Sequence, residues 1–163
     1  MYAFTEIKEK FVIENLFSIM QYIFSQNSIE EFVMKQITTR LYTQGTDRFL
    51  NKLATDAGRP YYSLATQMEK IDKGQKITNV TLSDTYTFYN SFQIVAKEYY
   101  FEIKADFIKE YDGIYQGNIS ENFKKSYSSQ SNFENAIAAL SDNEMNNLLG
   151  QVKPKIIELL KKL

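Results

Sequence analysis

Hydrophobic residues repeat at helical spacing near the start of the chain. Between about residues 5 and 25 they recur every three or four positions, as Val12, Leu16, Ile19, Met20 and Ile23. A second apolar stripe runs beside the first and consists of Ile13, Phe17 and Phe24. The spacing predicts one long helix. A helix that is apolar over so much of its circumference needs a second partner surface, which is either a neighbouring subunit or more of its own core.

Residues with capping character divide the chain after this helix. Ser28 and Glu31 have the spacing of a capping box, so we expect a second helix to begin there, after a short turn. Gly45 suits a left-handed cap at its C-terminal end. Residues 45–82 are weakly patterned and predict a long loop, with a short helix over about 63–72.

The hydrophobic period changes to two within residues 92–106, after a short helix for which Ser83 or Asp84 is the expected cap. Strands are expected over 92–96 and 99–106, joined by a tight turn at Lys97 and Glu98. In the second strand three apolar residues alternate with charged ones, and they are Phe101, Ile103 and Ala105. This alternation predicts a half-buried antiparallel hairpin.

The C-terminal part returns to helix after a polar stretch. Residues 107–132 are expected to be irregular, and 126–132 to form an exposed loop. Helical spacing resumes over 133–140, and Ser141 with Glu144 forms another capping box before a helix that Pro154 should kink or restart. The sequence therefore predicts one α+β domain over residues 1–163, with a helical N-terminus, a small antiparallel sheet (the hairpin at about 92–106) and a helical C-terminus.

Composition narrows the chemistry that this fold could carry. The 163 residues include no cysteine and no histidine, which excludes disulfides, nucleophile–histidine triads and the common zinc, haem and iron–sulfur sites. We therefore expect no metal and no cofactor. Nineteen basic residues oppose twenty acidic ones, which does not favour nucleic-acid binding. The longest charge-free run near the start, residues 15–29, is too short and too polar to span a membrane, so we expect a soluble protein made in a cytoplasm.

Two further features suggest chemistry or contact. Asp84-Thr85 begins like an aspartic-protease motif, but Tyr86 follows instead of glycine and the motif occurs once, so a helix cap is the favoured interpretation. A carboxylate-based hydrolase is kept as a hypothesis, behind the two that are given below.

Tyrosine and phenylalanine, twelve of each, are typical of either an aromatic core or a protein–protein interface.

The segment from residue 41 to residue 106 resembles small virion proteins of tailed phages that infect Bacteroidetes, including crAss-like phages. A weaker match follows at Leu140-Ser141, Glu144 and Leu148. Tyr86 departs from the family pattern, which usually has glycine there. The matching residues of the main segment are Leu41-Tyr42-Thr43-Gln44-Gly45, Tyr61-Tyr62-Ser63-Leu64-Ala65-Thr66, Lys70, Lys73-Gly74-Gln75, Val80-Thr81-Leu82-Ser83-Asp84-Thr85, Phe88, Ser91-Phe92 and Ile103-Lys104-Ala105-Asp106.

The resemblance implies a non-enzymatic structural protein of the virion. The sequence pattern is also similar to the wider neck and tail-completion family of long-tailed phages, whose members form rings at the head–tail junction or the top of the tail. The resemblance implies partners that are copies of the chain itself and neighbouring portal, neck or tail proteins. Asp84, Thr85, Phe88 and Ser91 would then set the local fold, and the candidate interface residues are Val12, Leu16, Phe17, Met20, Phe24, Tyr61 and Tyr62.

An alternative of another class is a small cytoplasmic protein-binding module, such as a phage-encoded adaptor or inhibitor of a host protein. A high-order ring, or copurification with portal and tail proteins, would favour the structural protein. A one-to-one complex with a host protein would favour the binding module.

Overall fold

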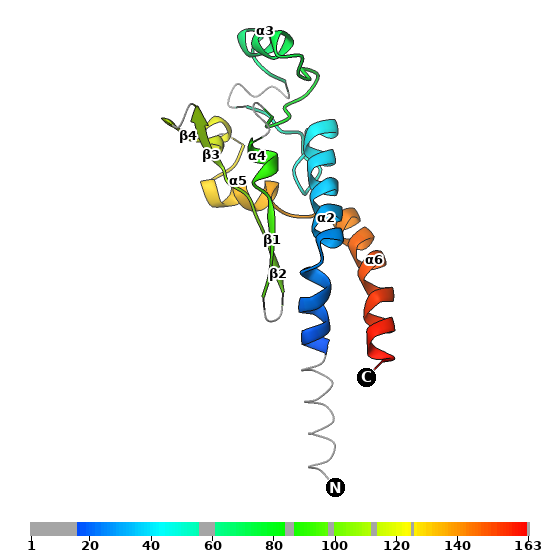
Figure 1. Cartoon of the computed structure of the whole chain (residues 1–163). Helices are drawn as coiled ribbons and strands as arrows, with labels where there is room; N and C mark the ends of the chain where they lie inside the picture. The colour runs from blue at the N-terminus through cyan, green and yellow to red at the C-terminus, as the bar shows by residue number, and fades with distance from the viewer. Residues whose placement is uncertain are drawn as a thin grey trace.

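The computed structural model describes residues 16–55, 61–83, 87–97, 100–111, 114–124 and 126–162. Within these ranges the fold is α+β, as predicted, with helices toward both ends and antiparallel hairpins between them (Figure 1). The molecule is elongated. Helix α3 lies at one end, and the N-terminal helix and the C-terminal end of α6 lie side by side at the other (Figure 1).

The first helices follow the hydrophobic repeat. The N-terminal helix is described over residues 16–24, and a turn at Ser25 and Gln26 leads into α2 (Asn27–Thr39), which continues as a π-helix (Arg40–Gln44). The predicted capping box at Ser28 is wrong, because Gln26 precedes the helix and makes no side-chain cap. Ser28 is the second residue of the helix, so its side chain lies past the cap position. Glu30, in the first turn, accepts a hydrogen bond from the Ile94 N–H (3.3 Å).

Gly45 ends this helix in the left-handed conformation, as predicted, with φ of 61°. Its N–H donates to the carbonyls of Arg40 and Leu41 (both 3.1 Å). A Cβ here would lie 2.5 Å from Asn79 Nδ2 and 2.7 Å from the Val80 carbonyl oxygen. Glycine is therefore required both for its backbone conformation and for its lack of a side chain.

Gly45→Ala should lower the free energy of unfolding by about 2–4 kcal/mol, from left-handed strain and steric overlap together. Gly74→Ala is the matched control. Gly74 also has a positive φ (64°), but no described atom lies within 4 Å of a Cβ there, so strain of about 1 kcal/mol is the only expected cost. Urea unfolding of both variants measures the difference, and equal losses would contradict the account.

Two antiparallel hairpins form the β-structure. The predicted hairpin is present as β1 (Gln93–Ala96) and β2 (Phe101–Lys104), with Ile94 opposite Ile103. A second hairpin, β3 (Ile108–Tyr111) with β4 (Ile114–Asn118), lies where irregular chain was expected. This hairpin is short and its register shifts between Ile108 and Glu110, so the alternation that marks a regular strand is weak.

The C-terminal elements are mostly helical. A 3₁₀-helix (Ile119–Phe123) leads toward α5 (Gln130–Ile137), which Ser129 caps, so the expected loop over 126–132 ends three residues early. The capping box of Ser141 and Glu144 is confirmed at the start of α6 (Asp142–Leu160). Helix α6 contains Pro154 and continues as one helix, so no restart occurs.

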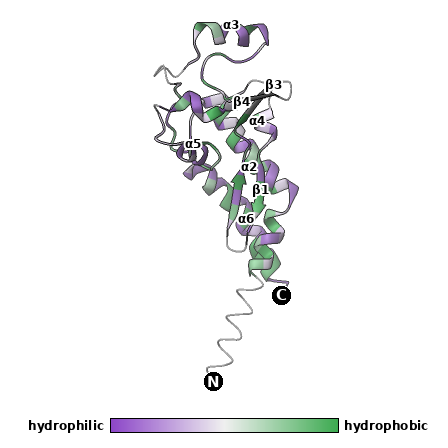
Figure 2. Cartoon of the chain, turned by 90° about the vertical axis from the view of Figure 1, so that its left-hand side faces the viewer, coloured by the Kyte–Doolittle hydropathy of each residue, from purple (hydrophilic) through white to green (hydrophobic). Residues whose placement is uncertain are grey.

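Aromatic side chains fill much of the core. Phe88 of α4 (Thr87–Asn90) contacts the rings of Phe92 and Phe107, and Phe107 contacts Phe133 of α5. Phe133 is completely buried and stacks on Phe123. The N-terminal helix, α2 and α6 add apolar stripes to this core, and loop residues such as Leu53 and Val80 complete it. Figure 2 shows that hydrophobic residues continue beyond this core, over the end of the molecule where the N-terminal helix lies beside α6.

Candidate functional site

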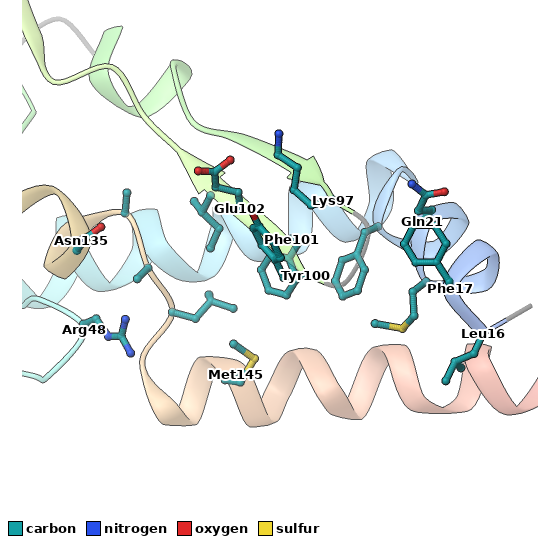
Figure 3. A pocket seen from close by; sticks show the side chains of 16 residues that line it. Leu16, Phe17, Gln21, Arg48, Lys97, Tyr100, Phe101, Glu102, Asn135 and Met145 are labelled. Carbon is teal, nitrogen blue, oxygen red and sulfur yellow. The ribbon is translucent and has the colours of Figure 1, made fainter. Parts of the chain in front are cut away.

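An apolar groove of about 710 Å³ opens between the N-terminal helix, the β1–β2 hairpin and the start of α6. The N-terminal helix contributes Leu16, Phe17, Met20, Gln21 and Phe24 to its lining. The other walls come from far apart in the sequence, and their residues are Arg48, Lys97, Tyr100, Phe101, Glu102, Ile103, Asn135, Ala138, Ala139, Leu140 and Met145. Figure 3 shows the hairpin side chains opposite Met145, with Arg48 toward one end of the groove and Leu16 toward the other.

Hydrophobic side chains that remain open to solvent line this groove. Phe24 stacks on Phe101, with 4.6 Å between the ring centroids, and this pair forms its inner wall. Tyr100 is 64% exposed at the rim, and Leu16 and Met145 are also exposed. An apolar hollow of this size with exposed walls is typical of a contact surface for a small molecule or another protein.

The described charged side chains that line the groove leave a positive balance. Glu102 pairs with Lys104 (3.4 Å) on the hairpin. Arg48 lies over the Phe49 ring (5.1 Å), and among the described residues neither Arg48 nor Lys97 has a carboxylate partner. Two cations therefore remain available to an acidic ligand or partner.

Asp47 and Arg40 hold the groove's margin in place. The Asp47 carboxylate accepts hydrogen bonds from the N–H groups of Phe49 and Asn51 (2.9 and 3.0 Å), and these fix the turn that carries Arg48. Arg40 donates to the Ala139 carbonyl (2.7 Å), which holds the segment between α5 and α6 that lines the groove. These hydrogen bonds fix the backbone segments that carry two of the groove's walls.

Tyr127 closes the cluster around Asp47. Its hydroxyl donates to Asp47 Oδ2 (3.0 Å). Burial first, and then the negative charge of Asp47, raise the pKa of Tyr127 far above its usual range. The phenol therefore stays protonated in the folded chain at pH values where it ionises in the unfolded one.

The raised pKa of Tyr127 predicts an alkaline loss of stability. Below pH 10, near the pKa of tyrosine in an unfolded chain, the contribution of Tyr127 to the free energy of unfolding is fully present, and it declines as the pH rises further. At pH 8, Tyr127→Phe should lower the free energy of unfolding by about 1 kcal/mol, because the hydrogen bond is lost. Between pH 10 and 11.5 the stability of this variant should fall less steeply than that of the wild type. Unfolding midpoints of both proteins against pH measure this, and parallel curves would argue against it.

Four of the residues predicted for an interface, Leu16, Phe17, Met20 and Phe24, lie together in the groove. Val12 lies outside the described residues. The structure does not bring Tyr61 and Tyr62 to this site, because they precede α3 (Leu64–Asp72) at the far end of the molecule (Figure 1). Tyr61 is exposed, and the Tyr62 hydroxyl is 3.1 Å from Thr81 Oγ1.

The family-motif residues have mixed outcomes. Asp84 and Thr85 lie outside the described residues, and Ser83, the other expected cap, has no hydrogen-bond partner for its buried hydroxyl among the described atoms. Phe88 is buried in the aromatic core. Ser91 accepts from the Asp106 N–H (2.8 Å) and donates to the Phe88 carbonyl (2.6 Å), so it links α4 to the chain that follows β2.

Helix α3 presents its apolar side to solvent. Of its nine described residues only Lys70 is buried. The Lys70 ammonium lies 4.7 Å from the centroid of the Tyr62 ring, and it donates to the Ser83 carbonyl and to Gln75 Oε1 (2.9 Å). Leu64, Met68 and Ile71, which we call the α3 stripe, are 75%, 61% and 57% exposed. Surface helices normally bury such a stripe, so α3 is inverted relative to the usual arrangement.

The other walls of the groove and the inversion of α3 were not predicted from the sequence. The signal for Tyr100 was its place beside the hairpin turn, and the signal for Met145 was the apolar repeat after the Ser141 cap. Within the described ranges no three metal-binding side chains gather, and no helix there is long and apolar enough to cross a membrane.

Comparisons with known proteins returned no counterpart. No family model matches the sequence, and neither a curated protein nor a solved structure matches it.

Proposed function

We propose that this chain is a non-enzymatic structural protein of a tailed-phage virion, a subunit that forms a ring with copies of itself. Its place would be the head–tail connector, the neck or the completed end of the tail, reached after synthesis in the host cytoplasm. Neighbouring portal, neck or tail proteins would be its other partners. The sequence resemblance over residues 41–106, with its weaker continuation at Leu140-Ser141, supports this location.

One structural observation carries the self-assembly part of the proposal. Among the described residues, nothing covers two separate apolar surfaces, the groove and the α3 stripe, and these lie toward opposite ends of the molecule (Figure 1). A subunit of a cyclic ring contacts its two neighbours through two different patches. Monomeric proteins rarely expose large contiguous apolar patches, and such patches are typical of protein–protein contact sites.

The proposal is tested by negative-stain imaging of the purified chain, alone and mixed with the portal protein of the same phage. Rings in either sample, or copurification of the chain with portal and tail proteins from infected cells, is the expected result. A stable one-to-one complex with a host protein, without rings, would instead support the protein-binding module, for which the groove alone would suffice.

A further inference from the structure

We propose that the α3 stripe of one copy seats in the apolar groove of the next copy. This inference rests on the proposed function and names the interface that would build the ring. Both apolar surfaces, the groove and the α3 stripe, would be buried in this one contact, and a second copy of this chain would occupy the groove.

The geometry of α3 matches helix-in-groove recognition. Leu64, Met68 and Ile71 are separated by four and three positions, so their side chains lie along one narrow face of the helix. Anchors at this spacing are those that amphipathic helices place into hydrophobic grooves of their partners. The inward contacts of Lys70 with Tyr62 and Ser83 hold α3 in the orientation that points this face outward.

The position of α3 excludes its own groove as the docking site. Figure 1 shows α3 beyond the upper end of α2, whereas the groove lies near the N-terminal helix and the tip of the β1–β2 hairpin. The body of the domain separates them, and in it α2 packs against α6 and against the β1–β2 hairpin. The complementary surfaces can therefore meet only between different copies.

The charges of the two surfaces are complementary. Glu69 and Asp72 are exposed on α3, and neither has an ion-pair partner among the described residues. The one basic residue within α3, Lys70, is turned inward. The groove offers Arg48 and Lys97, while Glu102, the one carboxylate among its described lining residues, is already paired with Lys104. Opposite charges around an apolar contact steer association and fix its orientation.

A contact between two different patches has a direct consequence for assembly. Each copy would use its groove toward one neighbour and its α3 stripe toward the other, so the interface is head-to-tail. Such an interface closes into a ring when the rotation between copies divides a full turn, and it extends into a filament otherwise. An isologous dimer would instead place each α3 stripe in the groove of the other copy, and it would stop at two subunits.

Single cysteines can test this arrangement without background, because the natural chain has none. Met68→Cys places a thiol on the α3 stripe and Met145→Cys places one in the groove. Both methionines are partly exposed (61% and 36%), so the variants should keep the wild-type unfolding midpoint. Lys35→Cys, on an exposed position of α2 outside the groove, is the matched control for Met145→Cys.

The two variants are mixed and treated with a short bismaleimide crosslinker, and peptide mass spectrometry identifies the linked positions. The proposal predicts links between positions 68 and 145 at several-fold higher yield than between 68 and 35. It also predicts a ladder of covalent trimers and higher species for the double variant Met68→Cys/Met145→Cys. Equal yields with the control, or links only between two copies of position 68, would overturn it.

Light scattering of the wild-type chain at the same concentration, alone and with the portal protein added, distinguishes failure of this interface from failure of the ring-forming function. Oligomers without links between 68 and 145 would overturn this interface while leaving the ring-forming function in place. A wild-type chain that stays monomeric and unlinked, both alone and with the portal protein added, would overturn both. A charge exchange tests how α3 is oriented in the groove. Asp72→Lys should reduce the yield of crosslinks between positions 68 and 145, and a partner copy that carries Lys97→Asp should restore it. A yield that is not restored would argue against this pairing of charges.

Discussion

Replacing Glu144 with alanine should lower the free energy of unfolding by about 3–5 kcal/mol, because the substitution leaves a buried guanidinium without its counter-charge. Arg40 is only 3% exposed, and its Nε donates to both carboxylate oxygens of Glu144 (3.0 and 3.1 Å). Arg40 also donates to the carbonyls of Thr46 (2.9 Å) and Ala139. The pair therefore fastens the end of α2 to the start of α6.

Glu144 has a second role that adds to this effect. Its carboxylate accepts a hydrogen bond from the Ser141 N–H (2.7 Å), and its own N–H donates to Ser141 Oγ, which completes the capping box of α6. Loss of the reciprocal cap alone costs about 1 kcal/mol. Since Met145 follows Glu144 and Ala139 is held by Arg40, the variant should also loosen one wall of the groove.

Urea unfolding of Glu144→Ala, Arg40→Met and the double variant measures this coupling. The double variant should be more stable than the sum of the two losses implies, because it removes both buried charges together. Lys162→Ala is the control, since its ion pair with Glu158 is exposed at the end of the same helix and should not affect the midpoint. A loss for Glu144→Ala no larger than that of the control would contradict the account.

Phe133→Ala should destabilise the fold by about 3–5 kcal/mol, the cost of removing a large aromatic side chain from a packed core. Phe133 is 0% exposed and contacts three rings. It stacks on Phe123 (4.8 Å between centroids) and meets Phe107 and Tyr127 edge to face (5.8 and 5.2 Å). These rings join α5, the 3₁₀-helix and the chain between the hairpins, so the substitution leaves a cavity among packed aromatic side chains.

The matched control for this substitution is Phe49→Ala, because Phe49 is 65% exposed and packs mainly against Arg48. Thermal and urea unfolding of both variants give the comparison. We expect a clear drop in the midpoint for Phe133→Ala and almost none for Phe49→Ala. Similar midpoints for the two would mean that the aromatic cluster is not the centre of the core.

Local signals in the sequence predict the elements that are determined locally. Gly45 ends a helix because glycine adopts the left-handed cap conformation without strain, and Ser141 with Glu144 opens one because the two caps are reciprocal. The β1–β2 hairpin followed from alternation. The β3–β4 hairpin was missed because its pattern is irregular, although Asp112-Gly113 between its strands is a common hairpin-turn signal.

Features that depend on tertiary contacts could not be predicted in the same way. The N-terminal stripe indicated that Leu16, Phe17 and Met20 would need a second surface, but its partners Tyr100 and Met145 come close only after folding. Likewise, the repeat in α3 is the same as that of a helix packed on a core. Its outward direction follows from the contacts of Lys70 with groups that precede and follow the helix in the chain.

Native mass spectrometry of the purified wild-type chain, over a range of concentrations and with the portal protein added, tests the central claim most directly. The account predicts that, alone or on the portal, the mass reaches a single closed multiple of the subunit, because each head-to-tail contact leaves one free groove and one free α3 stripe until the ring closes. A mass that stays at one or two subunits under all of these conditions would contradict it.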